Sequence, residues 1–263
     1  MLRHFLTSPP PSKLAIGLAV LPLAIPITYL VYHDRVISNN LKTFTGIRNK
    51  KKRLTIPIPP DISKPATLPT EVASDDSEWV LAYERIVSQP VDPSSLPHHH
   101  HDMSALLTRY VRATMAAFSW TPQAFLLRAS AGDGDVRRTF DTAFIQGLGF
   151  REGDRVNGFW RVLYRGDGGL GPQGGERVEM ALDAPAGYRG PVVNGVVVAG
   201  VEVQGGGEVV FVNETWMWRK QGEPPVLLER GMGRWLHVVL SGWLVMKGVR
   251  TVMEGREGRE KSA

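Results

Sequence analysis

An uncharged run of nineteen residues, from Leu14 to Tyr32, constrains this chain more than any other stretch of its sequence. A helix needs about 20 mainly apolar residues to cross a bilayer, so the run predicts one transmembrane helix. Pro22 and Pro26 are tolerated in a membrane helix, which they kink. The alternative is a cleaved signal peptide, whose apolar region is shorter, about 7–15 residues, and ends at a small-residue cleavage site. The sequence favours a retained anchor.

The formal net charge of +5 is concentrated near the start of the chain. Residues 1–60 carry nine Lys and Arg side chains against one acid, Asp34, which leaves the other 203 residues with a net charge of −3. A slightly acidic folded part lacks the basic surface that nucleic acids require, so we expect no nucleic-acid partner. Because the chain has no cysteine, disulfides and thiol catalysis are excluded.

The basic residues that flank the apolar run predict its orientation. The C-terminal flank holds more Lys and Arg, including the block from Lys50 to Arg53, and the richer flank tends to stay cytoplasmic. We therefore expect a single-pass membrane protein with a cytosolic domain, anchored in the endoplasmic reticulum or another endomembrane. Asn213 begins an Asn-Glu-Thr triplet that is a glycosylation site only in a lumenal domain, and its modification stays open.

Composition divides the chain into five segments. We expect an N-terminal tail at residues 1–13 and the transmembrane helix at 14–32, followed by a basic and proline-rich linker at 33–74. A folded domain then covers residues 75–253, and a charged, disordered tail covers 254–263.

Hydrophobic periodicity predicts an α+β domain whose antiparallel sheet is packed by helices. Apolar residues recur at helical spacing in three segments and alternate with period two in four others. Glycine-rich links between the alternating segments favour antiparallel hairpins. The helical segments are 104–118, 136–148 and 231–253, and the strand segments are 155–165, 177–182, 192–204 and 208–219.

The strand predicted at residues 208–219 is apolar on both faces, so both faces must be covered. The last helix can cover one face, and the helices between residues 104 and 148 can cover the other. Tight packing explains this pattern, and so does a cavity for a hydrophobic ligand. The candidate ligand-binding residues are the aromatic side chains Trp160, Tyr164, Trp216, Trp218 and Trp235.

Sequence motifs for metals and cofactors are not convincing. The run His98–His101 lies in a predicted loop without a second ligand cluster, so we predict no metal site. Gly166, Gly168 and Gly171 match a dinucleotide-binding spacing, but a strand pattern follows where a helix is required. We therefore expect no cofactor.

Candidate catalytic residues are few. General acid–base chemistry would fall to His237 or to a carboxyl group buried among apolar residues, because burial raises a carboxyl pKa toward neutrality. Glu202 and Glu214 are the candidates, since each interrupts an apolar strand. The alternatives are a structural histidine and a glutamate that faces water.

The order of these elements resembles the helix-grip domains of the START and polyketide-cyclase superfamily, over about residues 79–253. That resemblance implies an apolar ligand gripped between a curved sheet and the C-terminal helix. The segments GDRVNGFWRV, NETWMWR and GRWLH, together with the anchor, are also similar to uncharacterised membrane-tethered proteins of filamentous fungi, some of them connected with secondary metabolism.

Two hypotheses follow from the sequence. In the first, a membrane-anchored domain binds, and in an enzymatic version transforms, a hydrophobic small molecule such as a lipid or a polyketide. In the second, the chain is a non-catalytic membrane-tethered adaptor for a protein partner that the sequence does not identify. A cavity that contains His237 or a carboxyl group favours the first hypothesis, and a solid core favours the second.

Overall fold

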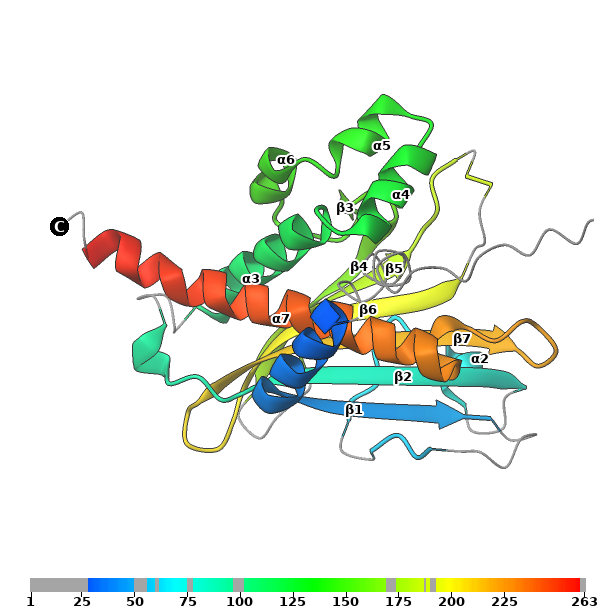
Figure 1. Cartoon of the computed structure of the whole chain (residues 1–263), viewed down its shortest axis with the longest axis horizontal. Coiled ribbons are helices and arrows are strands. Elements are labelled where there is room, and N and C mark those ends of the chain that lie inside the picture. Colours follow the sequence, from blue (N-terminus) through cyan, green and yellow to red (C-terminus); the bar gives the residue numbers. More distant parts are fainter. Residues whose placement is uncertain are drawn as a thin grey trace, which may run out of the picture.

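A computed structural model gives the structure of the chain (Figure 1). Of the transmembrane helix expected at 14–32, only residues 28–32 are described, as part of a helix of residues 28–40. The tail at 1–13 and the run His98–His101 lie outside the described residues. Within the described residues, no helix has the length and apolar character needed to cross a membrane. The described residues are 28–49, 56–59, 62–74, 78–96, 102–168, 174–186, 188–189 and 193–260.

Seven antiparallel strands form one sheet in the order β1-β2-β7-β6-β5-β4-β3. Strands β3 to β7 are neighbours in sequence order, and β2 pairs with β7, which joins the early part of the sheet to its last strand. The expected α+β class with an antiparallel sheet is confirmed. The strands are β1 (Leu41–Arg48), β2 (Trp79–Ser88), β3 (Arg155–Val156), β4 (Trp160–Asp167), β5 (Gly175–Leu182), β6 (Asn194–Val203) and β7 (Val209–Lys220).

Two long helices, α3 and α7, pack on one face of the sheet, which we call the helix face (Figure 1). Asp102 caps α3 by accepting a hydrogen bond from the Ala105 amide at 2.9 Å. Pro122 begins α4 at the first helical position, where a missing N–H costs nothing. The helices are α2 (Thr70–Ala73), α3 (Met103–Phe118), α4 (Pro122–Ser130), α5 (Gly134–Arg138), α6 (Thr142–Gly147) and α7 (Gly231–Glu260), with short 3-10 turns at Pro93–Ser95 and Leu227–Glu229.

The opposite face of the sheet is covered by residues 62–74, which we call the strap. Leu68 and Val72 of the strap are buried against Tyr83 and Trp216. Both faces of β7 are therefore covered, as its apolar pattern predicts. The prediction that helices from residues 104–148 cover the second face is wrong, because α3 packs on the same face as α7.

Two segments are more ordered than their composition indicates. Strand β1 and the strap both lie inside residues 33–74, for which proline and basic residues suggest a linker. Helix α7 continues to Glu260, through most of the tail expected to be disordered at 254–263.

The strand expected at residues 155–165 is in fact a hairpin. Asn157 and Gly158 both have positive φ angles, 48° and 67°, and they turn the chain between β3 and β4. Asn-Gly is the residue pair that such tight turns favour, because both residues tolerate left-handed backbone conformations. The prediction of one continuous strand over residues 155–165 is therefore wrong.

Close packing of α3 against α7 depends on Gly248. A Cβ atom at this position would lie 2.5 Å from Cε2 of Tyr110, which is fully buried, and 2.7 Å from Cγ2 of Thr114. We expect Gly248→Ala to lower the free energy of unfolding by about 1–3 kcal/mol, the usual cost of overpacking a core. Gly231→Ala is the matched control, since a Cβ there meets no atom within 4 Å. Equal urea midpoints for the two variants would contradict this packing.

Candidate functional site

A cavity of about 230 Å³ lies on the helix face, where α4, β4 to β7 and α7 meet. Apolar side chains make most of its wall, among them Phe159, Trp160 and Met217. The polar side chains on the wall include the hydroxyl group of Thr215 and the imidazole of His237. An apolar space with a few polar groups is the usual form of a small-molecule site.

The imidazole of His237 is held by a buried carboxyl group. Its Nδ1 lies 2.7 Å from Oε1 of Glu84, whose side chain is 1% exposed, and 3.3 Å from Oγ of Ser241. The other carboxyl oxygen of Glu84 has no hydrogen-bond partner among the described residues. The sequence analysis identified His237 but missed Glu84. Glu84 could have been predicted from the sequence by the same criterion, since it interrupts an apolar strand as Glu202 and Glu214 do.

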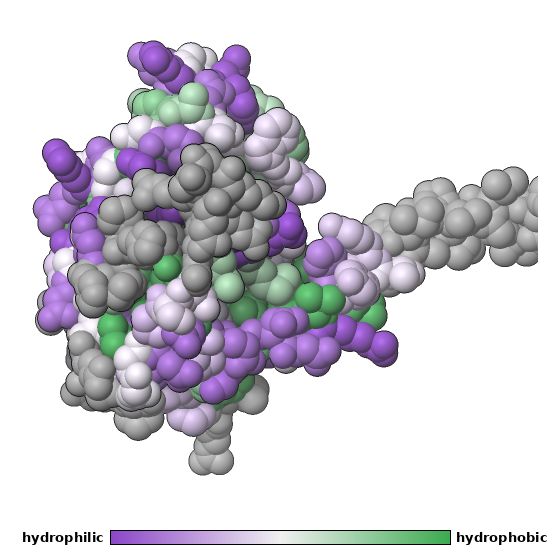
Figure 2. Space-filling view, turned by 90° about the vertical axis from the view of Figure 1, so that its left-hand side faces the viewer, coloured by the Kyte–Doolittle hydropathy of each residue, from purple (hydrophilic) through white to green (hydrophobic). Residues whose placement is uncertain are grey.

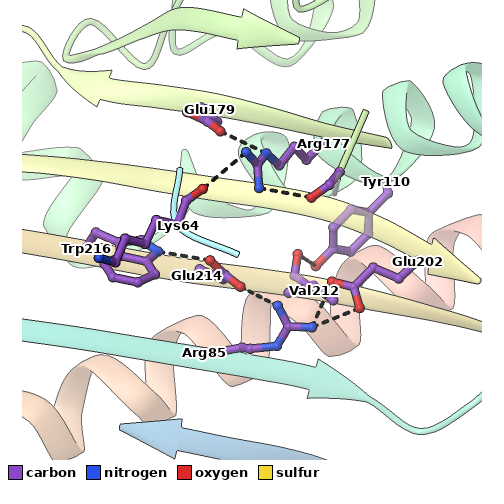
Figure 3. A network of polar contacts seen from close by, with 10 residues as sticks. Lys64, Arg85, Tyr110, Arg177, Glu179, Glu202, Val212, Glu214 and Trp216 are labelled. Carbon is purple, nitrogen blue, oxygen red and sulfur yellow. Dashed lines mark hydrogen bonds and ion pairs between the residues drawn. The ribbon is translucent and has the colours of Figure 1, made fainter. Parts of the chain in front are cut away.

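Strand alternation separates the two candidate glutamates from His237. Consecutive residues of a strand point to opposite faces, so Glu84 reaches α7 while Arg85 lies on the strap face. There Arg85 donates hydrogen bonds to both carboxyl oxygens of Glu202, at 2.7 and 2.8 Å, and one to Glu214 (Figure 3). Both glutamates are at most 2% exposed. The alternative that Glu202 faces water is wrong.

A second group of polar contacts on this face, around Glu179, holds the strap. Its carboxylate accepts hydrogen bonds from the amides of Ala66 and Thr67, both at 2.8 Å, and from the Thr67 hydroxyl at 2.6 Å. Arg177 lies 2.8 Å from Glu179 and also donates to the carbonyl of Gly168 at 2.9 Å (Figure 3). These contacts fix the strap to β5, and they give this network a structural role.

Of the five predicted aromatic residues, Trp160 alone lines the cavity. Trp216 is fully buried on the strap face, where its indole donates to Glu214 at 2.9 Å, and Trp218 packs in the same cluster. The indole of Trp235 donates to Asp34 of the 28–40 helix at 2.9 Å.

Tyr164 also lies outside the cavity wall. Its hydroxyl donates to the carbonyl of Asp167 at 3.2 Å, and its ring lies beneath the guanidinium of Arg177. The structure therefore brings together Trp160 and His237, and it leaves the other predicted site residues elsewhere in the fold.

The pKa of Glu214 gives a pH dependence that can be tested. Burial raises this pKa above its ordinary value of 4.5, although Arg85 and the Trp216 indole favour the ionised form. Folded chains then bind more protons than unfolded ones, so the free energy of unfolding falls as pH rises from about 4.5 through the raised pKa. Glu214→Gln should remove this slope in urea unfolding at a series of pH values. Parallel pH curves for the two proteins would contradict the raised pKa.

A second hollow is an open groove of about 700 Å³ beside the last turns of α7. Leu41, Val91, Met246, Val249 and Met253 contribute its apolar surface. Figure 2 views the molecule from the side that faces left in Figure 1, and hydrophobic surface is visible in its right-hand part, above a row of hydrophilic side chains. No histidine is among the described residues that line the groove, whereas His237 lines the cavity.

Among the described residues, no three His, Asp or Glu side chains come together as metal ligands would. The run His98–His101 lies outside those residues.

No protein-family model matches this sequence, and no curated protein or solved structure is significantly similar to it.

Proposed function

We propose that this protein is a membrane-anchored domain that binds a hydrophobic small molecule in the cavity between its sheet and α7. The observation that carries the proposal is an apolar cavity with His237, held by Glu84, in its wall. A solid core at this point would have favoured the adaptor hypothesis. The anchor is the apolar run Leu14–Tyr32, and the domain lies on the cytosolic side of an endomembrane.

The helix-grip resemblance supports the position of the ligand. In those domains the ligand lies between an antiparallel sheet and a C-terminal helix. In this chain α7 crosses the helix face of a seven-stranded antiparallel sheet (Figure 1). His237 of α7 is in the wall of the cavity, together with residues of four strands. We therefore propose a helix-grip type of fold and a ligand in contact with both elements.

The cavity size restricts the ligand. A volume of about 230 Å³ equals that of about seven or eight water molecules in the liquid. A compact compound of one or two rings fits this space, whereas a lipid with long acyl chains does not. Of the two ligand classes expected from the sequence, we favour a small polyketide-like ring compound, consistent with a role in secondary metabolism.

The membrane anchor fits such a ligand. A hydrophobic compound partitions into the bilayer, and a tether keeps the domain near that reservoir. A ligand that enters from the membrane then reaches the cavity without a long path through water.

The test is to purify the full-length chain in lipid nanodiscs and identify co-purifying compounds by mass spectrometry. We expect one or a few compact lipophilic compounds in near-stoichiometric amount, and quenching of tryptophan fluorescence when the emptied protein is titrated with them, because Trp160 lines the cavity. Absence of any such compound, with no fluorescence change across a panel of small lipophiles, would overturn the proposal and favour the adaptor.

A further inference from the structure

We infer that the cavity is a proton-transfer site in which His237 is the general base and Glu84 is its positioning residue. This inference rests on the proposed function, because it requires that a hydrophobic molecule enters the cavity. It names the chemistry of that site and the class of molecule on which it acts.

The contact with Glu84 determines which nitrogen of His237 is available. In this proposal the Glu84 carboxyl group accepts the hydrogen bond, so the Nδ1 atom of His237, 2.7 Å away, carries a hydrogen and donates it. Neutral imidazole has one hydrogen, and the lone pair is then on Nε2. Glu84 therefore holds the ring in the tautomer and orientation of a base, the role that a buried carboxylate has beside a catalytic histidine.

The Nε2 atom is the ring nitrogen left for the cavity. His237 is one of the wall residues and its side chain is 17% exposed, and its contacts with Glu84 and Ser241 are both made by Nδ1. The strap-face carboxylates differ, because Arg85 engages both Glu202 and Glu214. A purely structural histidine would have both nitrogens paired or one facing bulk water.

The wall indicates which molecules such a base would act on. No Asp, Glu, Lys or Arg is among the described residues in the wall of this cavity, so a charged ligand would lose its hydration without a counter-charge. The substrate class is therefore a neutral ring compound with an acidic C–H next to a carbonyl group. Hydroxyl groups of Thr215 and Tyr188 on the same wall can donate to the carbonyl oxygen.

The reaction needs no oxidant, reductant or metal. The Nε2 lone pair of His237 takes the proton, the C–H electron pair becomes the C=C bond of an enolate, and the C=O pair moves to oxygen. The imidazolium then returns the proton to another atom of the same molecule. If the enolate is conjugated with a C=C bond and the γ carbon takes the proton, the C=O bond re-forms and the result is an isomerisation. If a β-hydroxyl group takes the proton, the C=O bond re-forms, a C=C bond forms as the C–O bond breaks, water departs and the result is a dehydration.

A probe of known chemistry tests the base without the natural substrate. 5-Nitrobenzisoxazole is a neutral ring compound of suitable size, and removal of its C–H proton breaks its N–O bond to give a coloured cyanophenolate. Binding is followed separately, by quenching of tryptophan fluorescence. To remove background imidazoles, the full-length reference protein carries alanine at each of positions 98 to 101.

In that reference, we expect saturable turnover of the probe. His237→Ala should lower kcat/KM by about 10²–10⁴-fold, the usual contribution of a general base, and added imidazole should restore part of the rate. His237→Gln should bind the probe without turning it over. Glu84→Gln should lower kcat and leave KM unchanged, which a merely structural role would not produce. His33→Ala, on the 28–40 helix, should leave the rate unchanged.

Failure of the inference differs from failure of the proposed function. Fluorescence quenching with no turnover, or turnover that persists in His237→Ala and His237→Gln, would overturn the base and leave the binding site standing. No quenching by this probe or by any member of the lipophile panel would overturn both.

Discussion

Arg85→Met is expected to lower the free energy of unfolding by about 3–5 kcal/mol, the cost of breaking a buried ion pair from one side. Arg85 is 8% exposed and is the guanidinium that binds both Glu202 and Glu214. Methionine preserves the apolar stem and removes the charge, so two carboxylates would remain buried without a cation. Urea unfolding at neutral pH, followed by tryptophan fluorescence, measures the loss.

Two comparisons make this prediction specific. Arg250→Met removes an exposed ion pair with Glu254 one helical turn away and should leave the urea midpoint unchanged. The triple variant Arg85→Met, Glu202→Gln, Glu214→Gln should recover much of the stability, since amides carry no charge to leave unpaired. Equal midpoints for Arg85→Met and the unmodified protein would show that the network is not buried as described.

Val197→Phe is expected to weaken ligand binding strongly while the protein stays folded. Val197 lies on β6 in the cavity wall, so the added ring atoms occupy space that the ligand needs. In a cavity of about 230 Å³ we expect the affinity for a one-ring or two-ring compound to fall by more than about tenfold, or 1.4 kcal/mol.

Leu163→Phe is the matched control for this change, because its side chain is 40% exposed on β4, away from the cavity wall. Isothermal titration of both variants with the co-purifying compound gives the comparison. Unchanged affinity in Val197→Phe, with an unchanged urea midpoint, would mean that the ligand binds somewhere else.

Local pattern was sufficient to predict the main layers of the fold. The apolar character of both faces of β7 required two covers, and both exist. The identity of the second cover could not be predicted. Proline-rich composition suggests a spacer, whereas the strap is held by contacts between Ala66, Thr67 and Glu179, which are more than a hundred residues apart in sequence. Such contacts leave no periodic signal.

The site was predictable only in part. A lone histidine on an amphipathic helix and an aromatic residue on a strand indicated His237 and Trp160. The sequence does not show which buried carboxyl group contacts His237. That depends on the sheet face on which each carboxyl group lies and on the basic side chain opposite it. Glu84 meets His237 and Glu214 meets Arg85, and this pairing follows from strand register rather than from local sequence.

Photo-crosslinking tests the central claim, a ligand between the sheet and α7, most directly. A small apolar diazirine is bound to the full-length protein, activated by light and mapped by mass spectrometry. If the ligand binds in the cavity, the label lies on peptides that contain Trp160, Thr215 or His237, and its amount saturates with diazirine concentration. The same label is lost in Val197→Phe. Label confined to Met246 and Met253 of the open groove, or label that does not saturate, would contradict it.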